Sequence, residues 1–230
     1  YVLAMEEISA VDASVGVIMS VNNSLVTYGL QKHGSDHIKQ KYLVPLATGE
    51  KLGAFALSEP EAGSDATSQK TEAIKVGDHW ELTGMKNWIT NGTTADYHLV
   101  VAQTDREKRH RGITTFLVEK GWEGFDLGKK EDKLGIRSSD TCSLMFNKTP
   151  VPDENVLWEV GKGFNFAMDT LNGGRIGIAA QALGIAKGSL DAAIQYSKER
   201  KAFGQVISEF QAIQFKLADM ATKLDAARML

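Results

Sequence analysis

Cysteine is almost absent from this sequence. The 230 residues contain one, Cys142, so no disulfide bond can form within the chain. Such sparing use of cysteine is typical of proteins that work in a reducing compartment. Cys142 stands in a stretch of alternating apolar residues, and we expect it to be a packed core residue rather than a nucleophile.

The sequence also lacks a long apolar run and an excess of positive charge. No run approaches the ~18 apolar residues that span a bilayer, and no signal peptide is recognisable. The 26 basic and 29 acidic side chains give a net charge of −3. This balance offers no attraction for nucleic acid or an anionic membrane, and we expect neither as a partner.

Several catalytic motifs are missing as well. There is no G-x-G-x-x-G after a predicted strand, no P-loop, no H-E-x-x-H and no G-x-S-x-G. A Rossmann dehydrogenase, a P-loop nucleotidase, a zinc protease and a serine hydrolase therefore lose their usual sequence support. His33 and His37 have a helical metal-site spacing, but Gly34 and Ser35 intervene and no third ligand is evident. We therefore predict no metal site.

Both ends of the sequence have helical periodicity. Apolar residues recur at three- and four-residue intervals from Ile8 to Leu25, and Ser35 is expected to cap a later helix. A second stripe runs from Phe210 to Ala227. Between them, an alanine-rich run contains Gly173, Gly174, Gly177, Gly184 and Gly188. So many small residues predict close packing against another helix or a cofactor, or simply a compact bundle interior.

The central segment changes to the two-residue period of strands. Residues 73–76 and 80–83 flank a Gly-Asp turn and predict a hairpin, and further strands are predicted at 99–103, 113–118 and 141–146. The charged residues 105–111 are expected to form a solvated loop. The sequence thus predicts an α+β multidomain fold: a helical segment, a central antiparallel β-sandwich or barrel, and an incomplete C-terminal helical bundle.

Two stretches of this central segment end in hydroxyl, amide and glycine residues. They read Phe-Ala-Leu-Ser-Glu-Pro-Glu-Ala-Gly-Ser-Asp at 55–65 and Trp-Ile-Thr-Asn-Gly at 88–92. Gly63 would let the backbone approach a ligand closely. Trp88 offers a wall to a flat ligand such as a flavin ring, and Ser58 and Thr90 offer hydroxyls to its polar rim. On spacing alone, these residues are more typical of a core tryptophan followed by ordinary turns than of a flavin site.

Both stretches resemble signatures of the acyl-CoA dehydrogenase family. Residues 57–65 match its aliphatic-[Ser/Thr]-Glu-Pro-x-x-Gly-Ser-Asp run, and residues 86–92 match its Lys-x-Trp-Ile-[Ser/Thr]-Asn-Gly run. Further similarity follows in the family's order at 133–139, 151–157, 173–181, 200–204 and 210–211. It covers nearly the whole chain, and residues 173–186 look most like the short-chain, butyryl-CoA-type branch.

The resemblance implies an FAD-dependent enzyme that dehydrogenates an acyl-CoA thioester between its α and β carbons. In that reaction a carboxylate removes the α proton while the β hydrogen leaves as a hydride to flavin N5. It also implies three domains: part of an N-terminal helical domain at 1–51, a central β domain with the flavin and acyl-CoA site at 52–150, and the first part of a C-terminal helical domain at 151–230. A homo-oligomer, expected to be a tetramer, would pass electrons to an electron-transfer flavoprotein. The expected location is the bacterial cytoplasm or, in a eukaryote, the mitochondrial matrix.

The family's functional positions can be carried over one by one. The resemblance places Thr90 near flavin N5, and Ser64 against both the flavin and the CoA. Asn172 and Arg175 would meet the substrate along its acyl–pantetheine path, although relatives often have Asp in place of Asn172. Arg200 would reach the FAD pyrophosphate of a neighbouring subunit; without the family it would be interpreted as part of a solvated helix face. The expected cofactor-binding residues are Phe55, Leu57, Ser58, Gly63, Ser64, Trp88, Ile89, Thr90, Arg200, Phe203 and Gln211.

The resemblance assigns no catalytic base to this sequence. In most relatives the base is a Glu beyond the position of Leu230, and in a minority it stands where Gly174 stands here. Asp169 is a nearby carboxylate that no motif marks. We expect both ends of the chain to be cut, and the 230 residues alone to bind FAD poorly and to turn over little. A non-catalytic flavin-fold binding or assembly protein and an acyl-CoA oxidase are the alternatives, and the sequence does not fix the acyl length.

Overall fold

The structure, a computed structural model, describes all 230 residues and divides into two compact units. The larger unit comprises residues 18–175, and the smaller one joins residues 1–17 to residues 176–230. Together they contain helices at both ends of the chain and strands in the middle, which confirms the predicted α+β class.

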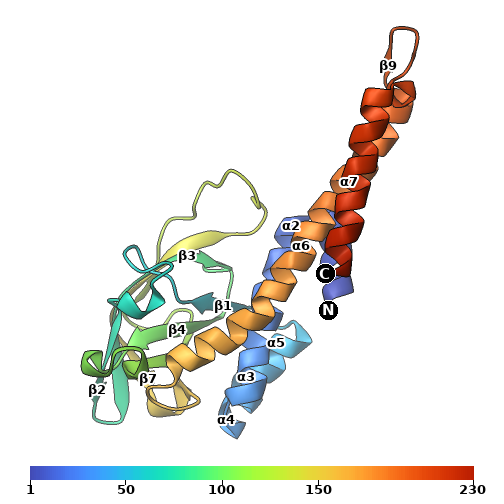
Figure 1. Cartoon of the computed structure of the whole chain (residues 1–230). Helices are drawn as coiled ribbons and strands as arrows, with labels where there is room; N and C mark the ends of the chain where they lie inside the picture. Colours follow the sequence, from blue (N-terminus) through green and yellow to red (C-terminus); the bar gives the residue numbers. More distant parts are fainter. The chain divides into compact units, whose positions relative to one another are not determined.

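The larger unit is built on an eight-stranded sheet (Figure 1). Its strands are β1 (Gly53–Ala56), β2 (Glu72–Val76), β3 (His79–Thr90), β4 (Tyr97–Gln103), β5 (Ile113–Glu119), β6 (Phe125–Leu127), β7 (Thr141–Pro152) and β8 (Val156–Leu157). They follow the order β6-β7-β3-β2-β4-β5-β8, with β1 paired to β4. The predicted hairpin forms between β2 and β3, where Lys75 lies opposite Trp80.

Two strand pairs depart from the antiparallel arrangement expected from the sequence. β1 runs parallel to β4 over four residue pairs, and Glu72 of β2 pairs in parallel with Gln103 of β4. In both cases the partners are not consecutive strands. The β2–β3 hairpin lies between β1 and β4 in the chain, and β3 lies between β2 and β4. Strand direction depends on such connections, which residue periodicity does not encode.

Strands β4 and β5 are buried on both faces. Leu99 and Leu117 pack into a core shared with the helices, whereas Val100 and Phe116 face a second core inside the sheet. Neither strand therefore shows the polar–apolar alternation of a sheet with one wet face. Cys142 belongs to the inner core and has no exposed surface, as predicted, and burial raises the pKa of its thiol to about 11.

Short helices cover one face of this sheet (Figure 1). They are α3 (Tyr28–His33), α4 (Asp36–Ile38) and α5 (Val44–Thr48), and π-helical turns precede α3 and α5 at Val21–Thr27 and Lys39–Leu43. Ser35 caps α4, as predicted, because its hydroxyl accepts a hydrogen bond from the Ile38 amide at 3.3 Å. Single 3₁₀ turns occupy Ala66–Ser68 and Asp153–Asn155, and the charged segment at Arg106–Gly112 is also 3₁₀ and mostly exposed.

The smaller unit is helical. It contains α1 (Val2–Val11), the start of α2 (Ala13–Ser20), α7 (Gln211–Met229) and residues 176–199 of α6 (Gly163–Glu199). The hairpin of β9 (Lys201–Ala202) and β10 (Gln205–Val206) and a 3₁₀ turn at Ile207–Glu209 connect α6 to α7. The two chain ends lie close together (Figure 1), where Arg228 donates to the Glu6 carboxylate.

The apolar stripe predicted from Ile8 to Leu25 does not form one continuous helical face. Asp12 is extended, with φ −146° and ψ 105°, and its carboxylate accepts from the Ser14 amide at 2.7 Å. This cap ends α1 and starts α2 in a new direction. Val11 is consequently 92% exposed, while Met5 and Ser9 form the buried side of α1.

Two of the predicted glycines allow α1 to approach α6. A Cβ at Gly184 would lie 2.3 Å from the Glu6 carbonyl oxygen, and one at Gly188 would lie 2.3 Å from that of Ala10. The close packing predicted from the glycine run is thus present at these positions, and the neighbour is a helix of the same chain. No helix in the structure is both long and apolar enough to cross a membrane.

Candidate functional site

The two signature stretches meet at one place in the larger unit. The backbone amide of Asn87, on β3, donates to the carbonyl oxygen of Ser58 at 2.8 Å. This bond joins the chain that leaves β1 to the last part of β3. The segments carrying Ser58 and Trp88, which are thirty positions apart in sequence, therefore lie side by side where β3 extends past its pairing with β2, and form a local edge there.

Trp88 is held in an unusual conformation at this edge. Its φ is 61°, a left-handed value that a bulky residue rarely adopts. It falls within a shift of strand register between Lys86 and Ile89, where β3 bulges away from β7. The residue is 61% exposed. The strand thus bends at a cost in backbone strain and presents a large aromatic surface to solvent, a combination that is typical of functional sites.

Hydroxyl groups and an open glycine accompany the indole. The side chains of Ser58, Ser64 and Thr90 make no hydrogen bond within the protein, and none of these residues is fully buried. A Cβ at Gly63 would touch nothing within 4 Å, so the space beside that backbone is free. An exposed aromatic wall with unpaired hydroxyls and an open backbone fits a planar ligand with a polar rim, such as a flavin ring.

Three other predicted flavin residues are less accessible. Ile89 is 2% exposed and belongs to the inner sheet core, so only its backbone is available to a ligand. Phe55 is half-buried and packs near Phe166, with ring centroids 6.3 Å apart. Leu57 is also half-buried, and its carbonyl oxygen already accepts a hydrogen bond from Lys86. Their side chains are therefore less available to a ligand than that of Trp88.

The turn after Thr90 is fixed by residues that are not among the predicted site residues. Asn91 is fully buried and donates from Nδ2 to the Gly53 carbonyl oxygen at 3.1 Å, while the Gly53 amide donates to Asn22 Oδ1 at 3.0 Å. These contacts tie the end of β3 to the start of β1. Asn22 lies in a π-helical turn, a feature often found near functional sites, but only the folded backbone shows it.

Asp140 anchors the same turn from the far side. Its carboxylate accepts from the Thr93 amide at 2.7 Å and from the hydroxyls of Thr93 and Thr94. Burial disfavours the charged carboxylate, but the hydrogen bonds from the two threonines outweigh it and hold the pKa of Asp140 below its usual value. Thr90 is therefore positioned between a bulge and a tightly bonded turn.

The two predicted substrate residues lie together on α6. Arg175 Nη1 donates to Asn172 Oδ1 at 2.6 Å, and both side chains are exposed. Gly174 stands between them, with Leu25 Cδ2 3.0 Å from where a Cβ would be. The nearby Asp169 accepts from Lys32 Nζ at 2.8 Å and lies 3.0 Å from His33 Nε2. The hydrogen bond from Lys32, followed by that from His33, lowers the pKa of the Asp169 carboxyl.

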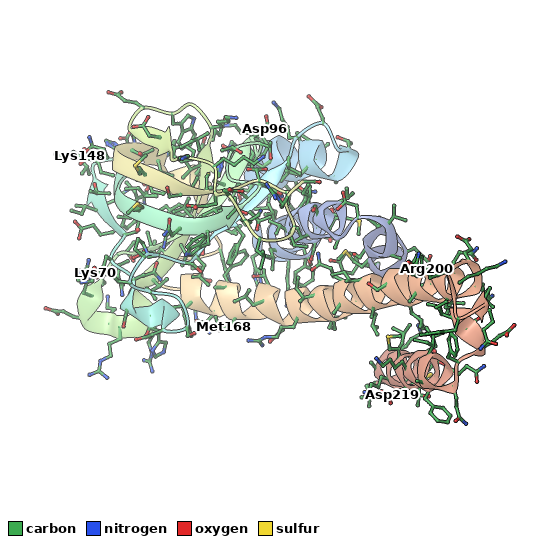
Figure 2. The ribbon with its side chains drawn as sticks, turned by 90° about the horizontal axis from the view of Figure 1, so that it is seen from above. Lys70, Asp96, Lys148, Met168, Arg200 and Asp219 are labelled. Atoms are coloured by element: carbon green, nitrogen blue, oxygen red, sulfur yellow. The ribbon has the colours of Figure 1, made fainter.

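The remaining predicted cofactor residues lie in the smaller unit. Arg200 follows α6, and Figure 2 labels it at that end of the helix. Phe203 and Gly204 have φ of 53° and 85°, as the two central residues of a tight hairpin turn, and Phe203 is 98% exposed. Gln211 begins α7. All three side chains are exposed, and no side-chain partner restrains Arg200 or Gln211.

The structure contains no cluster of three His, Cys, Asp or Glu side chains that could hold a metal ion. His33 faces Asp169, whereas His37 lies 3.4 Å from Glu154. The two histidines therefore have separate carboxylate partners.

A helical segment, a mixed sheet and a second helical segment define this as an α+β protein. Comparison with known proteins agrees with that class. Family models of the acyl-CoA dehydrogenase N-terminal, middle and C-terminal domains match residues 1–50, 54–149 and 161–230. The chain therefore belongs to the acyl-CoA dehydrogenase family.

Close relatives cover the whole chain. The mitochondrial short-chain specific acyl-CoA dehydrogenase of Mus musculus is 54% identical over 230 residues, which is 100% of this chain and 56% of that protein. The structure of butyryl-CoA dehydrogenase from Megasphaera elsdenii matches with a TM-score of 0.97 and 51% identity, over 99% of this chain and 60% of that one. A chain in a structure described for the electron transferring flavoprotein of Acidaminococcus fermentans matches with a TM-score of 0.98 and 52% identity, over 100% of this chain and 60% of that one. This chain thus spans less than two thirds of the length of these relatives.

Proposed function

We propose that the protein carrying these 230 residues is an FAD-dependent acyl-CoA dehydrogenase of the short-chain type. The observation that supports it most is Trp88, a residue inside a family signature that has a strained backbone and is 61% exposed. A protein of this family that bound no flat ligand there would carry backbone strain and exposed aromatic surface without use. The two relatives named short-chain and butyryl-CoA dehydrogenases, each above 50% identity, support the substrate class.

In this proposal the larger unit holds the flavin ring and the acyl-CoA. Trp88 and Thr90 would border the ring from β3, while Ser58, Gly63 and Ser64 would border it from the segment after β1. FAD held by these residues would supply the hydride acceptor for the oxidation of the substrate. The protein would contribute an aromatic wall, hydroxyls that orient the ring, and Arg175 with Asn172 for the polar part of the thioester.

The proposed reaction needs a base that these residues do not offer. Gly174 has no side chain, and Asp169 is held ionised by Lys32 and His33 rather than left free to take a proton from carbon. We propose that a carboxylate outside residues 1–230 removes the α proton. The domain boundaries 1–51, 52–150 and 151–230 stay part of this proposal, and the three family models support them.

We also propose an electron-transfer flavoprotein as the electron acceptor, because a structure described for such a protein contains a chain 52% identical to this one. The exposed Arg200, Phe203 and Gln211 would meet FAD bound to another copy of the chain. That arrangement requires a homo-oligomer, which we propose to be a tetramer.

The test is an anaerobic titration of the FAD-loaded complete gene product that contains this chain. Butyryl-CoA should bleach the visible flavin absorption, and electrons should then pass to an added electron-transfer flavoprotein. Unchanged absorption in the presence of saturating short-, medium- and long-chain acyl-CoA would leave the non-catalytic alternative. Release of peroxide in air at the rate of substrate oxidation would identify an oxidase instead.

A further inference from the structure

Lys86 is a fully buried lysine one residue before the Asn87–Ser58 bond. Its ammonium group donates to the Leu57 carbonyl oxygen at 3.0 Å, to Glu59 Oε1 at 2.7 Å and to Gln69 Oε1 at 3.0 Å. A lysine ammonium has three donors, so every one is used. The side chain is 0% exposed, and that of Glu59 is 2% exposed.

Glu59 extends this network to the far end of the same segment. Its carboxylate accepts from the backbone amides of Lys70 and Thr71, the latter at 3.1 Å, and its backbone pairs with Ala62 in both directions. The segment between, which includes Gly63 and Ser64, is mostly exposed. Lys86 and Glu59 therefore fasten both ends of an otherwise loosely packed segment to one point of β3.

That point lies directly beside the bulge. Lys86 still pairs with Leu144 of β7, and the register shift begins immediately after it. Asn87 binds Ser58 through the backbone, and Trp88 then turns outward. A displacement of the segment 57–71 relative to β3 would thus change the distance between Trp88 and the hydroxyls of Ser58 and Ser64.

A buried ion pair is weak evidence for stability, because the cost of removing two charges from water offsets most of their attraction. Its better-supported use is to specify one geometry among several. We infer that Lys86 is a positioning residue, which with Glu59 sets the spacing between the Ser58–Ser64 segment and Trp88 on the two sides of the flavin ring. This inference rests on the proposed function for the identity of the ring. The arrangement of the segment itself does not depend on it.

The experiment compares three variants of the complete gene product with the wild type. Lys86→Met removes the donor but keeps a linear apolar side chain. Lys86→Met with Glu59→Gln also removes the charge that would otherwise be left buried and unpaired, so it preserves folding if the single variant does not. Lys70→Met is the matched control, because Lys70 belongs to the same segment but its side chain is 68% exposed.

The first readout needs no flavin. In the wild type, hydrogen exchange at the amides of Lys70 and Thr71 should be slower than in residues 63–68 by a factor of about a hundred or more, and both Lys86 variants should lose most of that protection. The inference is wrong if these amides exchange in the wild type as fast as the exposed turn. This measurement tests the inference even if the wild type binds no FAD. In that case the proposed function is wrong, but the exchange result still decides whether Lys86 positions the segment.

The second readout is the bound flavin. Both Lys86 variants should shift the visible absorption and circular dichroism of bound FAD, raise its Kd about tenfold or more, and lower kcat more than they change KM. Lys70→Met should match the wild type. Recovery of the wild-type spectrum and Kd in the double variant would mean that Lys86 only neutralises the buried charge of Glu59. That result would contradict a positioning role.

Discussion

At the scale of single residues, two features define the candidate site: a strained backbone with positive φ, and side-chain hydroxyls without a hydrogen-bond partner. Trp88 has a positive φ and an exposed ring, while the adjacent Ile89 is buried in the core. The signature motif predicts that both line the flavin, but it does not distinguish a side-chain contact from a backbone contact. That distinction depends on the bulge, which arises from pairing with β7, a strand some fifty residues later in the chain.

Replacement of Trp88 by Asn should separate flavin binding from folding. Asn tolerates a positive φ, and the exposed indole contributes little to the core, so the free energy of unfolding should change by less than about 1 kcal/mol. Loss of an aromatic stacking surface, worth about 1–3 kcal/mol, should raise the Kd of FAD roughly tenfold or more. Urea unfolding of the flavin-free protein and a flavin titration measure the two effects.

Trp158 provides the matched control, because it too has a positive φ, 66°, and an exposed indole. It stacks on His33, with ring centroids 4.2 Å apart, and belongs to neither signature stretch. Trp158→Asn should leave the flavin Kd unchanged. An equal loss of flavin affinity in both variants would mean that Trp88 does not contact the ring.

His98 gives a prediction about pH. Its ring is fully buried, Nε2 donates to the Gly92 carbonyl oxygen at 3.0 Å, and Nδ1 has no partner. Burial lowers the pKa of His98 to about 4, from an ordinary value of 6.5. Between pH 4 and pH 6.5 the unfolded chain therefore binds more protons than the folded one. The contribution of His98 to the free energy of unfolding is fully present above pH 6.5 and is lost as the pH falls towards 4, by up to about 3 kcal/mol.

His98→Gln retains a donor for Gly92 but does not titrate in this range. Urea midpoints measured from pH 7.5 to 4.5 should fall less steeply for this variant than for the wild type, while His110→Gln, at an exposed position, should follow the wild type. Identical slopes for all three proteins would show that His98 is not the titrating group.

At the scale of elements, local chemistry predicts well wherever one or two residues decide the structure. The Ser35 cap and the β2–β3 hairpin are confirmed, because a hydroxyl at a helix start and a Gly-Asp turn act on their immediate neighbours. The break between α1 and α2 at Asp12 was not predicted, because periodicity alone does not show that an aspartate will leave one helix to cap the next. The roles of Asn22, Lys86 and Asp140 were not predicted either, because their partners are distant in sequence.

Two glycines of α6 should respond oppositely to the same substitution. A Cβ at Gly188 would lie 2.3 Å from the Ala10 carbonyl oxygen, whereas one at Gly173 would meet nothing within 4 Å. Gly188→Ala should therefore destabilise the protein by about 1–3 kcal/mol, because α1 must move away. Gly173→Ala should stabilise it by about 0.5–1 kcal/mol through helix propensity. Denaturant unfolding at pH 7.5 measures both; a Gly188→Ala protein as stable as the wild type would mean that α1 and α6 do not approach as closely as described.

At the scale of the whole molecule, the chain has the elements of three family domains but spans less than two thirds of the relatives it matches. The order of motifs along the sequence predicted the family and the α+β class, because each motif can be recognised from its own residues without knowledge of the contacts that they make. Subunit contacts are different, since exposure of Arg200 and Phe203 indicates which side chains are available but not what covers them.

Replacement of Arg200 by Met tests the expected contact with a neighbouring subunit's FAD. Arg200 has no side-chain partner within the chain, so thermal stability without flavin should stay within about 0.5 kcal/mol of the wild type. FAD affinity of the complete gene product should fall, because a cation that holds pyrophosphate oxygens is lost. The control is Lys223→Met, which removes an exposed cation paired with Asp219 (labelled in Figure 2) on α7. Equal FAD affinity in all three proteins would contradict the contact.

The most direct measurement is a crystal structure of the FAD-loaded complete gene product. The account predicts the isoalloxazine ring in contact with the indole of Trp88, with the hydroxyls of Thr90 and Ser58 within hydrogen-bonding distance of its rim. A ring bound elsewhere, or a Trp88 side chain that remains exposed to solvent in the FAD-loaded protein, would contradict it.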